Sequence, residues 1–230
     1  MRAKTFLGAC GALLCLTGCG GSTTGASTAN PSNNVRPNVT GDAFTYSLTG
    51  TYKATPTSLA THTTGTSTVM YQANTYASQP ALEETTTTVL NLASGTDTLT
   101  ANEQLSSAGV TLGVTDAGTL TAVSSGGFTR PTMLSATTSI NGTETLADGT
   151  TVTLGFAVTG TLNVTTTAGT FPCWVATRTI TYSDGFTSVE TMDFAPLIGA
   201  VVQDVIQNTY SNGFSFSVTS SLTTYAFGGT

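Results

Sequence analysis

Apolar and polar residues alternate along most of the chain after about residue 43. The run from Phe44 to Thr49 shows the pattern, with aromatic or aliphatic residues at the even positions and hydroxyl residues at the odd ones. Alternation with a period of two predicts strands that bury one face. Further strands are expected at 66–76, 84–92, 96–105, 110–114, 119–123, 133–140, 151–158, 161–167, 170–182, 187–194, 200–209 and 214–227. Residues 54–65 fit either a loop or a short helical turn.

Glycine-containing turn signals separate many of these segments. They are Gly126-Gly127, Asn141-Gly142, Asp148-Gly149, Asp184-Gly185 and Asn212-Gly213. Asn-Gly and Asp-Gly pairs favour tight hairpins. Neither an amphipathic helix nor a fixed repeat period is evident, which disfavours a solenoid or propeller. We therefore predict an all-β fold with a single antiparallel, strongly curved sheet, a half-barrel or open barrel of about eleven to thirteen strands.

Composition supports this prediction. Of the 230 residues, 53 are threonine, a β-branched residue that suits a half-buried pleated surface. Only 8% of residues are charged, whereas 39% are hydrophobic, which argues against a disordered chain.

The N-terminus has the features of an export signal. A short basic stretch, Met1 to Lys4, precedes an apolar stretch at 5–16 that is too short to span a bilayer. Leu16-Thr17-Gly18-Cys19 follows and resembles the bacterial lipobox. The resemblance implies that the Cys19 thiol takes a diacylglycerol and that cleavage precedes Cys19. Two or three acyl chains anchor a protein firmly, since each buried CH₂ contributes about 0.8 kcal/mol.

Two other cysteines compete as the cleavage site. Cys10 would leave too short an apolar core, and Cys15 follows the bulky Leu14. With Cys19 lipidated, the mature chain keeps only Cys173 as a thiol, so no internal disulfide is expected. The expected organisation is a signal peptide at 1–18, a lipidated Cys19 with a flexible polar tether at 19–40, and a β half-barrel domain at 41–230.

Charge excludes some partners. Beyond residue 18 the chain has four basic and twelve acidic residues, a net charge of −8. Nucleic-acid binding needs clustered Lys and Arg, as does electrostatic attachment to anionic lipids. Neither is expected, so the membrane partner is reached through the lipid anchor.

The segment 164–202 resembles a pattern of exported bacterial proteins whose sheets are similar to the LolA/LolB lipoprotein-carrier half-barrel. Ala168-Gly169-Thr170-Phe171 with Cys173 matches its first turn, and Phe194-Ala195-Pro196 with Gly199 and Val201 matches its second. The resemblance implies an antiparallel sheet of about eleven strands around an apolar hollow. In this sequence no helical lid is evident.

Catalytic and metal-binding chemistry is not indicated, and neither is a cofactor. His62 lies in a polar run, and Cys173 lies among aromatic residues as an inert packing group. Glu83-Glu84 and the pair Glu190/Asp193 should diverge rather than form dyads, and we interpret them as solvated side chains. His62 and Cys173 are the only soft ligands of the mature chain, too few for a zinc site.

These features predict a non-enzymatic lipoprotein of the bacterial envelope, at the outer membrane facing the periplasm or the cell surface. Its concave face is expected to hold an apolar ligand such as an acyl chain. The residues expected there are Phe156, Val158, Val175, Ile180, Phe194, Val205, Phe214 and Phe216. The alternative is a structural or adhesive envelope protein without a small-molecule ligand.

Overall fold

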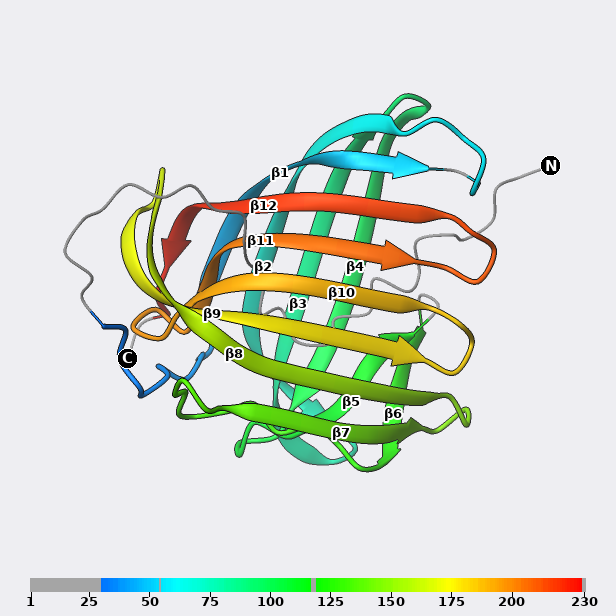
Figure 1. Cartoon of the computed structure of the whole chain (residues 1–230). Coiled ribbons are helices and arrows are strands. Elements are labelled where there is room, and N and C mark those ends of the chain that lie inside the picture. The colour runs from blue at the N-terminus through cyan, green and yellow to red at the C-terminus, as the bar shows by residue number, and fades with distance from the viewer. Residues whose placement is uncertain (1–29, 54, 117–118, 229–230) are drawn as a thin grey trace.

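A computed structural model describes residues 30–53, 55–116 and 119–228. These residues form twelve strands (Figure 1): β1 Ala43–Lys53, β2 Thr61–Tyr76, β3 Gln79–Leu92, β4 Gly95–Leu105, β5 Thr111–Asp116, β6 Thr119–Ser125, β7 Ser139–Leu146, β8 Thr151–Thr166, β9 Gly169–Tyr182, β10 Thr187–Ala195, β11 Ala200–Thr209 and β12 Ser215–Ala226. The predicted signal peptide, 1–18, and Cys19 lie outside the described residues. Within the described part of the chain, no helix is long and apolar enough to cross a membrane.

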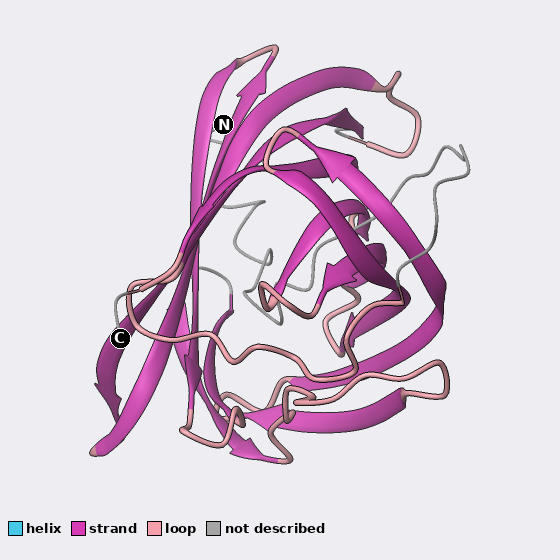
Figure 2. Ribbon diagram, turned by 90° about the vertical axis from the view of Figure 1, so that its left-hand side faces the viewer, coloured by secondary structure: helices cyan, strands magenta, loops and turns pink. Residues whose placement is uncertain are grey.

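The strands form one antiparallel sheet that curves until its edges meet. Each strand pairs with its neighbours in the chain, and β1 pairs with β12 from Ala43↔Ala226 to Lys53↔Ser215. The result is a closed barrel (Figure 2). The predicted all-β class, the single curved antiparallel sheet and the number of strands are confirmed. The curvature goes further than in a half-barrel, because full closure pairs the last two edges.

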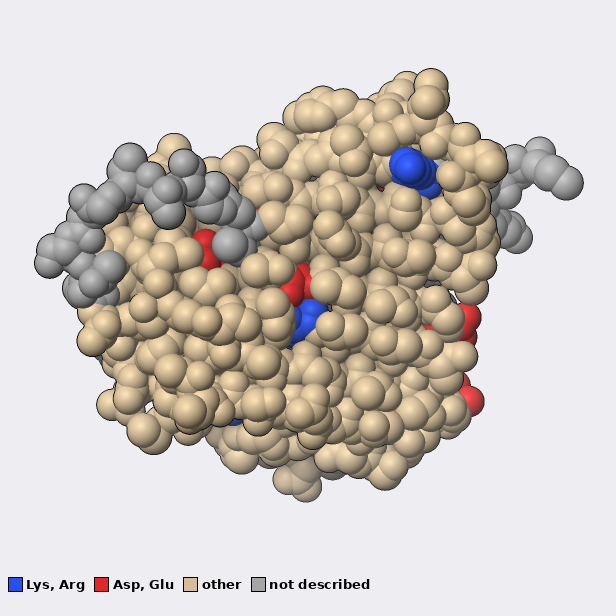
Figure 3. Space-filling model, viewed as in Figure 1, with Lys and Arg blue, Asp and Glu red and all other residues tan. Residues whose placement is uncertain are grey.

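Alternation places the apolar side chains inside the barrel. On β1, Phe44, Tyr46 and Leu48 are buried. Buried residues form three core clusters inside the barrel, one of them centred on β1, β2, β11 and β12. The opposite face of the strands is rich in threonine and serine, and Figure 3 shows a surface on which charged atoms are sparse.

One predicted strand and one predicted hairpin are wrong. Residues 126–138 form a long connection rather than a strand at 133–140, and Asn141-Gly142 lies inside β7 rather than in a turn. A Cβ on Gly142 would lie 3.0 Å from the ring of Phe128, which belongs to that connection. Gly142 therefore provides space for a packed side chain. The two strands expected at 151–158 and 161–167 are one strand, β8, with a bulge between Val158 and Gly160.

The chain enters β1 and leaves β12 at the same end of the barrel, which we call the proximal end (Figure 1). Residues 32–42, here called the N-terminal segment, are held against this end. The Trp174 indole donates to the Ser32 carbonyl at 3.0 Å, and the Arg36 amide donates to the Pro196 carbonyl at 2.8 Å. A Cβ on Gly199 would lie 2.3 Å from the Arg36 carbonyl oxygen, so glycine is required where the segment crosses the β10–β11 turn. The last part of the expected tether thus packs on the barrel.

Candidate functional site

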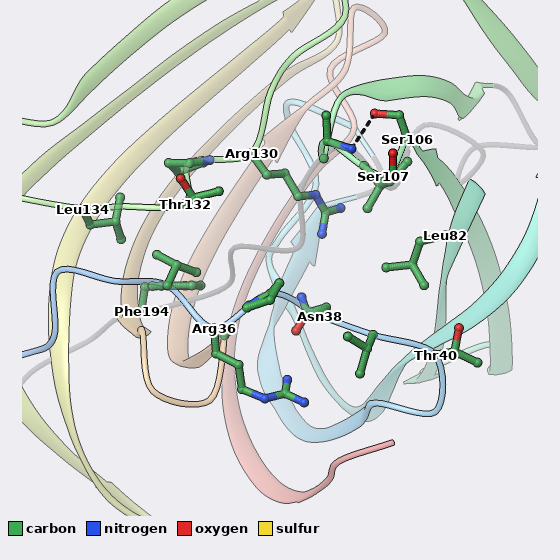
Figure 4. A pocket seen from close by; sticks show the side chains of 18 residues that line it. Arg36, Asn38, Thr40, Leu82, Ser106, Ser107, Arg130, Thr132, Leu134 and Phe194 are labelled. Atoms are coloured by element: carbon green, nitrogen blue, oxygen red, sulfur yellow. Dashed lines mark hydrogen bonds between the residues drawn. The ribbon is translucent and has the colours of Figure 1, made fainter. Parts of the chain in front are cut away.

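A pocket of about 610 Å³ lies at the proximal end (Figure 4). The N-terminal segment forms one wall, and the β4–β5 turn and the β6–β7 connection form the others. Strand residues complete it. The lining residues are Val35, Arg36, Pro37, Asn38, Val39, Thr40, Leu82, Leu105, Ser106, Ser107, Ala108, Gly109, Arg130, Pro131, Thr132, Leu134, Phe194 and Gly199. Half of them have apolar side chains, and the surface of the pocket is mainly apolar.

Backbone hydrogen bonds position the loops around the pocket. The Arg130 amide donates to the Gly109 carbonyl at 3.0 Å and joins the β6–β7 connection to the β4–β5 turn. The Val35 amide donates to the Thr132 carbonyl at 2.9 Å and joins that connection to the N-terminal segment. Backbone hydrogen bonds therefore join the three walls, which come from segments that are distant in sequence.

Arg130 forms the polar floor of the pocket. Its Nη1 donates to Glu84 Oε2 at 2.8 Å, and its Nη2 donates to Glu103 Oε2 at 2.6 Å. Glu84 also accepts a hydrogen bond from the Tyr71 hydroxyl at 2.5 Å, and Glu103 accepts one from Thr111 at 2.7 Å. Burial alone lowers the pKa of Arg130, but the charges of Glu103 and Glu84 outweigh burial and raise that pKa well above its ordinary value. Arg130 therefore stays protonated, and the carboxylates of Glu84 and Glu103 compensate its positive charge.

Two buried polar atoms of the lining residues have no hydrogen-bond partner: Arg130 Nε, a donor, and Asn38 Oδ1, an acceptor. In Figure 4 the Arg130 side chain extends into the space above the N-terminal segment, which carries Asn38. A buried polar group without a partner costs about 1–3 kcal/mol. An acceptor for Arg130 Nε and a donor for Asn38 Oδ1 would remove that cost.

A second polar cluster lies on the inner face of β9–β12. Arg178 and Glu190 are register partners and form an ion pair at 2.5 Å, and Asp204 Oδ1 accepts the Ser220 amide at 2.8 Å. Burial raises the pKa of Glu190 to about 8 although Arg178 opposes it, and burial raises the pKa of Asp204 to about 6. Among the described residues no group of three or more His, Cys, Asp or Glu side chains is arranged to hold a metal ion.

The structure brings few of the expected ligand residues together at a cavity. Phe194 lines the proximal pocket. Phe156 and Val158 pack with Phe194 in one core cluster, while Ile180 and Phe216 pack in or against the other two. Val175 and Val205 alternate with the buried positions of their strands and are only half-buried. Phe214 lies at the opposite, distal end, where its ring contacts Tyr52 and Tyr210.

No pattern in the sequence indicates the acidic interior. Seven of the twelve acidic residues are buried in the structure: Asp42, Glu84, Glu103, Glu144, Glu190, Asp193 and Asp204. The interpretation of Glu84, Glu190 and Asp193 as solvated is therefore wrong. Glu83 and Glu84 do diverge as expected, because Glu83 accepts a hydrogen bond from Gln104 while Glu84 binds Arg130. Arg130 and Asn38, which sequence reasoning missed, lie in irregular segments where alternation carries no information.

The two soft-ligand candidates, Cys173 and His62, lie apart from the pocket lining. Cys173 is a fully buried thiol in a core cluster, as predicted. His62 is exposed, and it belongs to β2 rather than to a loop.

No protein-family profile matches the sequence, and no curated protein matches it. Solved structures with similarity to this chain include a protein classed as exported, with a YmcC-like fold, from Bacteroides fragilis (14% identity, TM-score 0.38, 85% of this chain and 99% of that chain). A protein classed as a lipoprotein from Parabacteroides distasonis is similar at 12% identity and TM-score 0.38, over 86% of this chain and 100% of that chain. A β-barrel-like protein of domain of unknown function DUF1849 from Brucella abortus is similar at 10% identity and TM-score 0.46, over 84% and 99% of the two chains.

Proposed function

We propose that this protein is a lipid-anchored, non-enzymatic protein of the bacterial envelope that holds the acyl chain of an uncharged amphiphile in the proximal pocket. The observation that carries the proposal is the combination of a largely apolar pocket of about 610 Å³ with one unpaired donor and one unpaired acceptor. Ligand sites typically have volumes of about 300–1,000 Å³, apolar walls and a few polar groups that fix orientation.

The two unpaired atoms favour a particular polar group. Arg130 Nε requires an acceptor, such as an amide or ester carbonyl, and Asn38 Oδ1 requires a donor, such as an amide N–H or a hydroxyl. An amide-linked acyl chain, or an ester beside a hydroxyl, supplies both. Aliphatic walls such as Leu82, Leu105 and Leu134 suit the chain itself.

The charges at the floor disfavour a free fatty acid. Arg130 is already shared between two carboxylates, those of Glu84 and Glu103. An incoming carboxylate would meet a guanidinium whose two terminal nitrogens already bind Glu84 and Glu103, and like charges in a low-dielectric site repel strongly. The ligand class is therefore a neutral lipid rather than an anionic one.

The membrane anchor rests on the lipobox-like sequence before Cys19. In cells grown with labelled palmitate, the unmodified protein should carry the label and fractionate with membranes. The Cys19→Ala variant should lose the label. Labelled Cys19→Ala protein in the membrane fraction would contradict this part of the proposal.

Ligand binding is tested with a series of monoacylglycerols of increasing chain length, alongside fatty acids of the same length. Affinity should rise about fourfold for each added CH₂ until the pocket is full, because each CH₂ contributes about 0.8 kcal/mol. Monoacylglycerols should bind more tightly than the matched fatty acids. Isothermal titration of the purified protein measures both trends.

A pocket-filling variant identifies the site. Ala108 lines the pocket and is exposed, so Ala108→Trp should fill the space without disturbing the core and should abolish binding. Ala147→Trp, at an exposed turn of the distal end, is the matched control and should bind normally. Equal binding by the two variants, or no saturable binding at all, would contradict the proposal.

The alternative function is adhesion through the outer face of the barrel. The observation in its favour is a shallow depression of about 510 Å³ on β7–β9, lined by Asn141, Gly142, Thr143, Thr153, Leu154, Gly155, Thr179 and Thr181. Its hydroxyl and amide groups suit a neutral polar polymer. Retention of the protein on cell-wall polysaccharide, lost in a Gly155→Phe variant, would favour this alternative over lipid binding.

A further inference from the structure

Large exposed apolar side chains gather at the proximal end. They are Val39, Met133, Leu197, Tyr225 and Phe227, which together we call the proximal rim. Leu197 is 62% exposed and Met133 is 61% exposed. An exposed leucine alone is ordinary, but several such side chains at one end of the barrel indicate a surface that another apolar phase covers.

The N-terminal segment connects the rim residues to one another. Asn34 forms a β-bridge with Met133, and the Arg36 amide binds the carbonyl of Pro196, which precedes Leu197. The Arg36 guanidinium lies 4.0 Å from the centre of the Phe227 ring, and Phe227 in turn contacts Tyr225, with ring centroids 5.3 Å apart. Val39 both belongs to the rim and lines the pocket, so the rim adjoins the pocket.

The two ends of the barrel differ in charge. At the proximal rim, the charged neighbours Arg36 and Asp42 form an ion pair at 2.6 Å, which leaves no net charge. Two distal turns instead carry the exposed acids Asp148 and Asp184. Exposed leucines also occur away from the rim, as at Leu59 beside the distal end. Charge therefore opposes contact with an uncharged apolar partner less at the proximal rim than at the distal end.

The short stretch of chain between Cys19 and the proximal end indicates that the apolar phase is the lipid bilayer. The described chain begins at the proximal end, and eleven residues, 20–30, separate Cys19 from Pro31. Such a stretch spans at most about 40 Å. An acylated Cys19 therefore keeps the proximal end close to the bilayer at all times.

We propose that the proximal rim lies against the lipid bilayer, with its apolar side chains at the boundary between head groups and acyl chains and with the pocket mouth facing the lipid. This inference rests on the proposed acylation of Cys19. The absence of net charge at the rim fits zwitterionic lipid rather than electrostatic attraction to anionic lipid. An acyl chain would then pass from membrane to pocket without crossing water.

The test compares two positions on the acylated, full-length processed protein. Leu197→Cys places a thiol on the rim, and Leu59→Cys places one beside the distal end, where Leu59 is 91% exposed. Cys173 is buried, so an environment-sensitive dye labels the introduced thiol. Each labelled protein is incorporated into phosphatidylcholine vesicles that contain lipid with a nitroxide on its acyl chain.

The dye at position 197 should be quenched several-fold more strongly than the dye at position 59. A Met133→Cys variant provides a second rim position and should behave like position 197. Equal quenching at all positions in protein that floats with the vesicles would overturn the inference alone. Protein that does not float with the vesicles would overturn both the anchor and the inference.

Discussion

Glu144 is a buried carboxylate without an arginine of its own. It is 1% exposed and accepts a long hydrogen bond from the Phe128 amide, at 3.3 Å. Burial raises the pKa of Glu144 to about 7, and the nearby charge of Glu103 adds to the increase. Unpaired burial penalises the charged form, so this side chain holds a proton in the folded protein at pH values where the unfolded chain has lost it.

This predicts a stability that decreases as pH rises. Below about pH 4.5 Glu144 is protonated in both states, and its contribution to stability is fully present. Between about pH 4.5 and pH 7 it keeps its proton only when folded, so its contribution to the free energy of unfolding falls by about 1.4 kcal/mol per pH unit. The contribution is lost above pH 7. Urea denaturation at pH 5, 6, 7 and 8 measures the slope.

The Glu144→Gln variant removes this titration and keeps the hydrogen-bond acceptor. It should show a shallower pH slope than the unmodified protein and should be the more stable of the two at pH 8. Asp148→Asn, in an exposed turn, is the control and should leave the slope unchanged. An unaltered slope in Glu144→Gln would contradict the assignment.

The acidic interior also shows what alternation fails to predict at this scale. A period of two correctly assigns Glu83 and Glu84 to opposite faces, but the inward face of a strand is normally apolar. Burial of Glu84 depends on Arg130, which lies 46 residues later in an irregular connection. A pairing that distant leaves no local trace in the sequence.

Among the elements, the β2–β3 hairpin has an unusual turn. Ala77 and Ser78 connect the strands with positive φ angles of 49° and 65°. Both central residues of a tight type I′ turn need this conformation, for which Asn-Gly is favoured and side chains such as alanine carry a cost. The turn was missed in the sequence because neither residue is a typical turn former.

Replacing Ala77-Ser78 by Asn-Gly should therefore stabilise the protein by about 1 kcal/mol. The reason is relief of left-handed strain without loss of a contact. The replacement by Val-Val should instead destabilise it, because β-branched residues tolerate positive φ least. Thermal unfolding of the three proteins gives the order, and an Asn-Gly variant no more stable than the parent would contradict the assigned strain.

The other turns show when sequence suffices. Asp148-Gly149, Asp184-Gly185 and Asn212-Gly213 form turns as predicted, and each of the three glycines has a positive φ angle. Asn141-Gly142 has the same chemistry but lies within β7, where the missing side chain makes room for Phe128. A glycine required for packing and a glycine required for a turn look identical in sequence.

At the scale of the whole molecule, the alternation of apolar and polar residues does not predict that the barrel closes. The sequence of each strand predicts which of its two faces is buried. Whether β1 reaches β12 depends instead on the accumulated twist and stagger of all the strands. The candidate site is equally non-local, since its walls come from loops that three distant parts of the chain provide. Closure pairs β1 with β12 along the whole of β1, so these two strands expose no free edge to other chains.

Because the barrel is closed, the same ring of strands can be built from a chain that begins at a different strand. Ala43 and Ala226 are register partners, and Gly228 donates its amide to Asp42, so the barrel ends where it starts. The order of the strands around the ring does not depend on where the ring is cut. A circular permutant could join the C-terminus to Asn30 through a linker of about a dozen residues and open the Asp148-Gly149 turn. Its new termini would emerge at the distal end, and an acylated cysteine placed there would hold the same barrel upside down over the membrane.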